Sequence, residues 1–428
     1  MPHTWDRGDL ERRLCHALSI GHQALERLGT NGYCDANQPE EYIGPAKVIG
    51  ETAMLLLAAW HADSAGPLRA KVNALAAQLA PLARGRRMLL GMCLQPALAL
   101  EHALGHLCLA RMGYPDQRFD AVFDATLCAT AAKGRERLPH RVLEQEWLLR
   151  MCGRAPARLT PALPHAADVL AGTHHDVYGF THAVIFARDF GIDPQPLARS
   201  RSLILAEAEA MLARCLDEGD YDLSGELLWT WPLMRARWTP AATFGFRVLA
   251  RVEDLAGFLP SAGTSLDRLR ELAGEERKQY LVATAYHTVY VMGLLCAAAL
   301  RPQQAPPVRI VDPLMPAGAA DRVLPFLDDS GPKAYWWEEF QKLSGPERDA
   351  LAGLLLHIAL RRRAIRRDFE GVARLIRLAD ELRLEDSPLV VQAAEMLHRL
   401  MLCRQKSEPV LPFSAKPESS VRLCGAGC

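Results

Sequence analysis

The chain has 428 residues, half of them hydrophobic, so it carries enough apolar side chains for a large core. Fifty basic residues balance fifty acidic ones, and no long run of like charge occurs. A nucleic-acid partner is therefore not expected, because phosphate binding needs a concentrated basic face. The longest apolar runs, residues 53–60 and 289–300, are too short to cross a bilayer.

The cysteines and the start of the chain indicate the compartment. The eleven cysteines show no CxxC spacing, and most, such as Cys108 and Cys296, fall inside apolar helical patterns. This placement is typical of reduced core thiols. The start of the chain lacks the apolar stretch of a secretion signal. We therefore expect a cytoplasmic protein without a membrane span.

The first part of the chain is predicted to be helical almost throughout. Residues 1–30 form an amphipathic helix, and residues 31–46 form a polar loop. Five helices are then expected at about 47–63, 67–83, 86–112, 117–133 and 141–152. Ala and Leu dominate, whereas β-branched residues and alternating strand patterns are sparse. This composition predicts the all-α class.

A helical pattern over residues 173–191 is unusual in its polar and aromatic content. Its apolar residues recur at helical spacing, and a glycine ends it. His175, His182 and Asp189 fall two turns apart on one stripe, with aromatic residues between them. This stripe is too polar for ordinary core and too aromatic for ordinary surface. It predicts the wall of a pocket.

Prolines shape the C-terminal part of the chain. Repeated prolines in residues 301–335 predict a crossover loop. Helices are then expected at about 335–343, 345–368, 369–382 and up to about 403. Residues 405–428 are polar and proline-rich, which predicts a disordered tail, with Cys424 and Cys428 near its end. We expect residues 1–404 to form one domain.

Helical hairpins recur in the middle of the chain. Residues 107–127 and 185–205 share one plan, in which a helix end and a glycine precede a short turn and a new helix. Such hairpins must stack to bury their apolar faces, either in an open α-solenoid or in a closed α/α toroid. We expect the α/α toroid, because polar and aromatic residues lie near helix starts, which a ring brings to one mouth.

Four polar residues form the predicted site. Asp222 and Glu226 are four apart, so both carboxylates project from one helical face. With His182 and His287 they make a ligand set that suits a divalent metal such as zinc, iron or manganese. Without a metal, His287 or His182 is expected to act as a base that a carboxylate orients. Tyr290, one turn after His287, joins His182, Asp222 and His287 as predicted catalytic residues.

Each of these residues also has a purely structural interpretation. Asp222 is suited to cap a helix start. Glu226 is suited to pair with an arginine of a neighbouring hairpin, and His182 to bond a backbone carbonyl in the core. Taken together, these polar residues near helix starts favour a pocket. We expect His182 and His287 to approach each other across it.

Residues 286–294, Tyr-His-Thr-Val-Tyr-Val-Met-Gly-Leu, resemble the YHTxYxxxGL stretch of protein prenyltransferase β subunits, which are α/α toroids. In that family the histidine binds zinc together with an aspartate and a cysteine two residues after the aspartate. The resemblance implies zinc ligands at His287 and Asp222, whereas Ser224 stands in place of the cysteine. The match covers about ten residues without a basic motif for a lipid diphosphate, so it implies the toroid fold more than prenyl transfer.

The whole chain is also similar to an uncharacterised bacterial helical family with a Thr-His helix, an Asp-Leu-x-Gly-Glu-Leu helix and a Tyr-His-Thr helix, here at Thr181, Asp222 and Tyr286. This similarity implies no known activity. We expect a transferase or lyase-like enzyme of bacterial secondary metabolism that acts on a small-molecule or peptide substrate at the His/Asp/Glu pocket. The alternative is a non-catalytic helical scaffold for a peptide or protein partner, in which these side chains would be dispersed in surface ion pairs.

Overall fold

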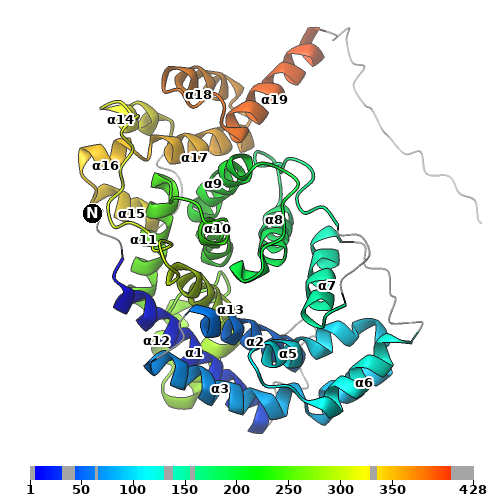
Figure 1. The fold of residues 1–428 in the computed structure, drawn as a ribbon. Helices are drawn as coiled ribbons and strands as arrows, with labels where there is room; N and C mark the ends of the chain where they lie inside the picture. Colours follow the sequence, from blue (N-terminus) through cyan, green and yellow to red (C-terminus); the bar gives the residue numbers. More distant parts are fainter. Residues whose placement is uncertain are drawn as a thin grey trace, which may run out of the picture.

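The computed structural model describes residues 5–30, 44–62, 66–129, 138–154, 160–327 and 335–405. These residues form nineteen α-helices and no β-strand (Figure 1). The all-α prediction is therefore confirmed. Residues 406–428 of the tail predicted at 405–428, and most of the predicted loop at 31–46, lie outside the described residues, whereas Gln405 is the last residue of α19.

The helices of the first half of the chain are α1 (Arg7–Thr30), α2 (Pro45–Ala62), α3 (Pro67–Ala83), α4 (Arg86–Leu94), α5 (Ala99–Arg111), α6 (Gln117–Leu127), α7 (Pro139–Met151), α8 (His174–Ala187), α9 (Arg201–Glu218) and α10 (Tyr221–Leu233). Those of the second half are α11 (Pro240–Ala256), α12 (Leu266–Glu271), α13 (Gly274–Ala299), α14 (Ala319–Val323), α15 (Tyr335–Gln341), α16 (Gly345–Asp349), α17 (Ala352–Ile365), α18 (Phe369–Glu381) and α19 (Pro388–Gln405).

Two predicted helices and one predicted loop differ from the structure. The helix expected at 86–112 breaks at Pro96, because proline lacks a backbone donor and restricts the residue before it. The helix expected at 345–368 divides into α16 and α17 at Asp349, whose carboxylate accepts hydrogen bonds from the backbone at the start of α14. The loop expected at 301–335 contains α14 itself, which the prolines around it concealed.

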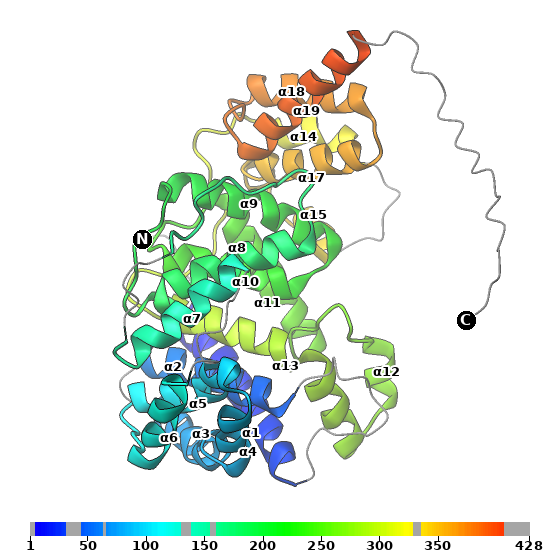
Figure 2. The ribbon, with the colours of Figure 1, turned by 90° about the vertical axis from the view of Figure 1, so that its right-hand side faces the viewer.

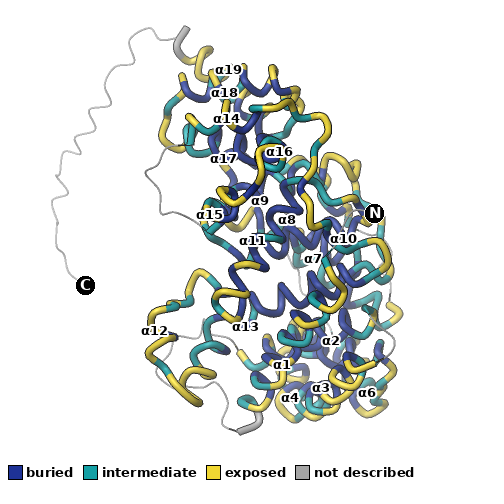
Figure 3. The backbone as a smooth tube through the Cα atoms, turned by 90° about the vertical axis from the view of Figure 1, so that its left-hand side faces the viewer, coloured by how far each residue is buried: buried dark blue, intermediate teal, exposed yellow. Residues whose placement is uncertain are grey.

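Helix α13 lies at the centre of the packing and contacts α1, α2 and α10. Its residues from Thr288 onward are buried, as the dark tube in Figure 3 shows. Gly293 permits the close approach of α1, because a Cβ atom at this position would lie 2.5 Å from the Cβ atom of Ala17. Close contact between two helices over many apolar side chains is the main source of stability here.

The neighbours of α13 are linked by a succession of helix contacts. Helix α2 packs on α5, α5 on α7, α7 on α8, and α8 on α10, which packs on α13. Helix α3 packs on α1 and α2, and α9 packs on α10. The C-terminal helices lie at one end of the molecule (Figure 2), where α17 and α19 contact α9.

Among the described helices, α13 has the length and apolar composition needed to cross a membrane. However, 78% of its apolar stretch is buried inside the fold, as expected also of a core helix. Helices α4 and α5 meet the same criterion only when they are taken together, and they are bent by 119° at the break between them.

A buried ion-pair network joins α1 to α11. The side chain of Arg13 is 1% exposed and pairs with Asp9 at 2.9 Å, with Asp254 at 3.0 Å and with the buried carboxylate of Glu253. Burial raises the pKa of Glu253, because desolvation disfavours the charged carboxylate, and the ion pair with Arg13 opposes this effect. Arg13 therefore stabilises the negative charge of Glu253 in its buried position.

We expect Arg13→Ala to lower the free energy of unfolding by about 3–5 kcal/mol, because it leaves a buried carboxylate without its cation. Arg12→Ala is the matched control, since Arg12 is 56% exposed and bonds to the same Asp9. Its cost should stay below about 1 kcal/mol. Urea denaturation of both variants measures the difference, and equal losses would contradict this role of Arg13.

Candidate functional site

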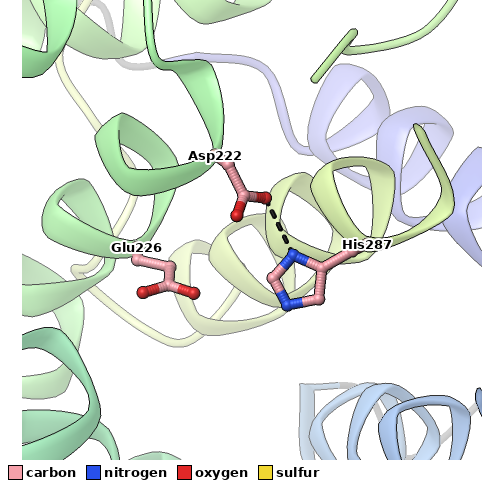
Figure 4. A group of neighbouring side chains, drawn as sticks. All are labelled: Asp222, Glu226 and His287. Atoms are coloured by element: carbon pink, nitrogen blue, oxygen red, sulfur yellow. Dashed lines mark hydrogen bonds and ion pairs between the residues drawn. The ribbon is translucent and has the colours of Figure 1, made fainter. Parts of the chain in front are cut away.

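Helix α10 carries the two carboxylates of the candidate site. Its N-cap is Asp220, whose side chain accepts a hydrogen bond from the backbone of Leu223 at 3.1 Å. The capping role proposed for Asp222 therefore belongs to Asp220. Asp222 and Glu226 lie one turn apart on the same face of α10 and point toward α13 (Figure 4).

His287 faces Asp222 from the middle of α13. The helix begins at Gly274, so His287 lies well inside it and not near its start as the sequence suggested. His287 Nδ1 donates to Asp222 Oδ1 at 2.9 Å. Burial opposes the charge on the imidazole, but Asp222 and Glu51 outweigh that effect and raise the pKa of His287 to about 10. His287 is thus an imidazolium paired with a carboxylate at neutral pH.

Glu226 lies deeper than Asp222 and is only 4% exposed. Its Oε2 accepts a hydrogen bond from the Thr181 hydroxyl of α8 at 2.5 Å. Burial, followed by the negative charge of Asp222, raises the pKa of Glu226 to about 8. Two neighbouring carboxylates that cannot both ionise in a buried site explain this value. Glu226 is therefore a neutral carboxylic acid at pH 7.

His182 approaches Glu226 from α8. Its Nδ1 lies 3.0 Å from the carbonyl oxygen of Tyr178 and 3.6 Å from Glu226 Oε2. Burial, with a contribution from the charge on His287, lowers the pKa of His182 to about 3, so the ring is neutral. His182 and His287 thus both lie near one carboxyl group, and His182 also makes the carbonyl bond of its structural interpretation.

Tyr290 and Ser224 point elsewhere. The Tyr290 hydroxyl hydrogen-bonds the buried Thr52 hydroxyl at 2.8 Å, and the residue is 1% exposed, so it belongs to the core between α13 and α2. Ser224 donates to the backbone oxygen of Asp220 at 2.6 Å, within its own helix. We therefore leave Tyr290 out of the candidate site, and Ser224 does not replace the missing cysteine.

The predicted wall along residues 173–191 is divided in the structure. Helix α8 ends at Ala187, and Asp189 follows with a φ of 46°, outside helical geometry. Asp189 is buried and binds Arg111 at 2.6 Å and the indole of Trp147 at 2.6 Å. His175 is exposed and lines a separate cavity. The early helix end moves Asp189 off the stripe, so only His182 of the three lies at the site.

The site also contains Glu51, which the sequence analysis did not single out, and Tyr178, one of the aromatic residues of the predicted stripe. Glu51 lies on α2, and its Oε1 is 3.7 Å from His287 Nε2. A carboxylate within the otherwise apolar run of α2 was the signal for it. The Tyr178 ring stacks on the His182 ring with 3.8 Å between centroids. Its position four residues before His182 was the signal, since such residues adjoin on a helix.

One ligand atom each from Asp222, Glu226 and His287 lies within 4.8 Å of the others, and this is the single such group among the residues described. One imidazole and two carboxylates suit zinc, iron or manganese. His287 and Asp222, to which the prenyltransferase resemblance assigns two zinc ligands, lie side by side, and Glu226 is the third member of the group. His182, which was predicted as a ligand, is not in this group.

An all-α fold with a partly buried carboxylate–histidine cluster on α10 and α13 defines the class of the protein. Residues 16–297, more than half of the chain, match the family described as a domain of unknown function, DUF6895. The chain belongs to this family, and the matched segment contains the whole cluster. No curated protein and no solved structure matches the chain.

The raised pKa of Glu226 predicts how stability depends on pH in protein kept free of metal by a chelator. Below its ordinary pKa of 4.5, Glu226 is protonated both folded and unfolded. As the pH rises toward about 8, the unfolded chain loses the proton and the folded protein keeps it, so stability falls. Glu226→Gln cannot titrate, so its stability should fall less between pH 5 and pH 8.

Between pH 5 and pH 8 the parent should lose more free energy of unfolding than Glu226→Gln does. We expect this difference to exceed about 1 kcal/mol, because one unit of pKa corresponds to about 1.4 kcal/mol. Urea denaturation at several pH values measures it. Groups far from residue 226 contribute equally to both curves. Parallel curves would show that Glu226 ionises normally in the folded protein.

Proposed function

We propose that the protein is an enzyme that binds a divalent metal at Asp222, Glu226 and His287 and acts there on a small-molecule or peptide substrate. The observation that carries this proposal is the convergence of the three ligand atoms within 4.8 Å. A scaffold has no need for three ionisable groups in one partly buried cluster, since each costs free energy of desolvation. The cluster therefore favours an enzyme over the alternative of a peptide-binding scaffold.

We further propose that the helices close into an α/α toroid. The contacts run from α2 through α5, α7, α8 and α10 to α13, and α13 packs back on α2. In an open α-solenoid the first and last helices of such a series would not meet. The six helices surround one central region in Figure 1, and the cluster is built from two of them, α10 and α13.

The three residues have different tasks in this proposal. A bound divalent metal would supply Lewis acidity and lower the pKa of a coordinated water. Asp222 holds the imidazole of His287 in one orientation through the 2.9 Å hydrogen bond. Asp222, Glu226 and His287 together offer two carboxylates and one imidazole as ligands.

Proton transfer is the second task of the site. Glu226 holds a proton at neutral pH and sits beside the Thr181 hydroxyl, which orients its carboxyl group. While no metal is bound, this neutral carboxylic acid is suited to act as a general acid. With a metal bound, Glu226 would be the carboxylate ligand and would lose this proton. His182 is neutral and lies 3.6 Å from the same carboxyl group, but its Nδ1 bonds the Tyr178 carbonyl oxygen, so it leaves the proton on Glu226.

The setting of the reaction is part of the proposal. We place the enzyme in the bacterial cytoplasm and its reaction, of transferase or lyase type, in secondary metabolism. The buried thiols of Cys108, Cys215 and Cys296 support a reducing compartment. The balance of fifty basic and fifty acidic residues supports a partner other than nucleic acid.

We expect Asp222→Ala and His287→Ala each to weaken the binding of Zn²⁺ or Mn²⁺ by at least about 10-fold, since each removes a ligand or the group that orients it. Isothermal titration calorimetry measures the affinity. Both variants should keep the helical circular dichroism of the parent, because Asp220 caps α10 independently.

Asp120→Ala is the matched control for these variants. Asp120 also bonds a histidine, His106, at 2.7 Å, but on α6 and α5 and outside the cluster. This variant should bind the metal as the parent does. A parent that binds neither metal would contradict the metal-dependent function, and equal losses in all three variants would contradict the assigned ligands.

A further inference from the structure

A cavity of about 1050 Å³ lies beside the candidate site, between the starts of α7 and α8 and residues 160–168. Its size is at the upper end of the range of small-molecule pockets. Its apolar lining includes Leu138, Leu143, Pro161, Leu163, Phe180 and Ala183. The cavity plays no part in the proton and metal chemistry derived above.

Several polar residues of the cavity wall already have partners within the protein. Asp176 binds the backbone and hydroxyl of Thr173 at the start of α8. Asp168 accepts from the backbone of Ala171 at 2.8 Å, and Arg141 pairs with Glu144 at 2.9 Å. The wall is therefore mainly an apolar surface whose charged groups are satisfied, which suits an uncharged ligand.

Tyr178 connects this cavity to the site. Its ring lines the cavity and stacks on His182 at 3.8 Å. The ring of His140, also in the cavity wall, lies 5.5 Å from Tyr178 and 6.1 Å from His182. His182 in turn lies 3.6 Å from Glu226. The rings of Tyr178 and His182 would therefore lie between a ligand in the cavity and Glu226.

Gly179 lies in the cavity wall next to Tyr178. It lies within α8, where glycine weakens a helix relative to alanine. A Cβ atom there would meet only the His140 ring, at 3.6 Å, which is ordinary contact. Backbone geometry does not require glycine at this position, since its φ is not positive. An alanine would therefore fit at this position, and a larger side chain would extend into the cavity beside Tyr178.

We propose that the cavity binds an uncharged apolar group of the substrate, aromatic or branched aliphatic, and holds it against Tyr178, whose ring adjoins His182 and the candidate site. The inference rests on the proposed function, because it assigns the cavity to the substrate of the same site. It adds a substrate class that the cluster itself does not specify.

The test is a fluorescence titration of the full-length protein with N-phenyl-1-naphthylamine, an uncharged aromatic probe. Ala183→Phe and Gly179→Leu each place a larger side chain in the cavity from α8. Each should weaken probe binding by about 10-fold or more, since small changes of volume in an apolar pocket have effects of this size. Ala77→Phe, on the exposed face of α3, is the control and should bind the probe as the parent does.

Titration of the same proteins with Mn²⁺ separates the two proposals. The cavity variants should keep the metal affinity of the parent, and Mn²⁺ should broaden the proton resonances of bound probe in the parent but not in Asp222→Ala. A parent that does not bind the probe, or filled variants that bind it unchanged, would overturn the cavity assignment while leaving the metal site intact. Metal binding without broadening would also overturn it, whereas failure of the metal to bind would refute the proposed function alone.

Discussion

The packing of α13 against α1, α2 and α10 is the constraint on which the rest of the structure depends. Gly293 allows α1 to approach closely, and Tyr290 ties α13 to α2 through Thr52. The same helix holds His287 toward Asp222 of α10. A tightly packed helix has few alternative positions, so the apolar contacts that stabilise the core also fix the imidazole relative to both carboxylates.

The electrostatics of the site differ from those of the structural ion pairs. Arg13 neutralises the buried carboxylate of Glu253 through a direct ion pair. At the site, by contrast, Asp222, Glu226 and Glu51 lie around one imidazolium, and Glu226 stays protonated because it is buried and adjoins the charge of Asp222. Such an excess of carboxylates is costly to fold, and an incoming cation or substrate would relieve it. This imbalance is the physical argument for function at this place.

The segment that matches the family contains the candidate site. The matched segment ends at residue 297, within α13, and includes every helix that contributes to the cluster. Among the helices after residue 318, α17 and α19 pack on α9, and α15 packs on α11. The cavity beside α7 and α8 also lies within the matched segment. The candidate site and the cavity therefore both lie in the segment that matches the family, and the helices after residue 318 lie outside it.

The sequence by itself determined the helical class, because the spacing of apolar residues and the choice of Ala and Leu are local properties. It also placed Asp222 and Glu226 on one face, since a separation of four is fixed by helical geometry. Only the tertiary structure decided which residues contact one another. Asp220 caps α10, Asp189 pairs with Arg111, and Tyr290 hydrogen-bonds Thr52. Glu51 reached His287 from a helix more than two hundred residues away in the chain. Contacts of this kind depend on how helices pack against one another, and side-chain periodicity within one helix carries no information about its partner.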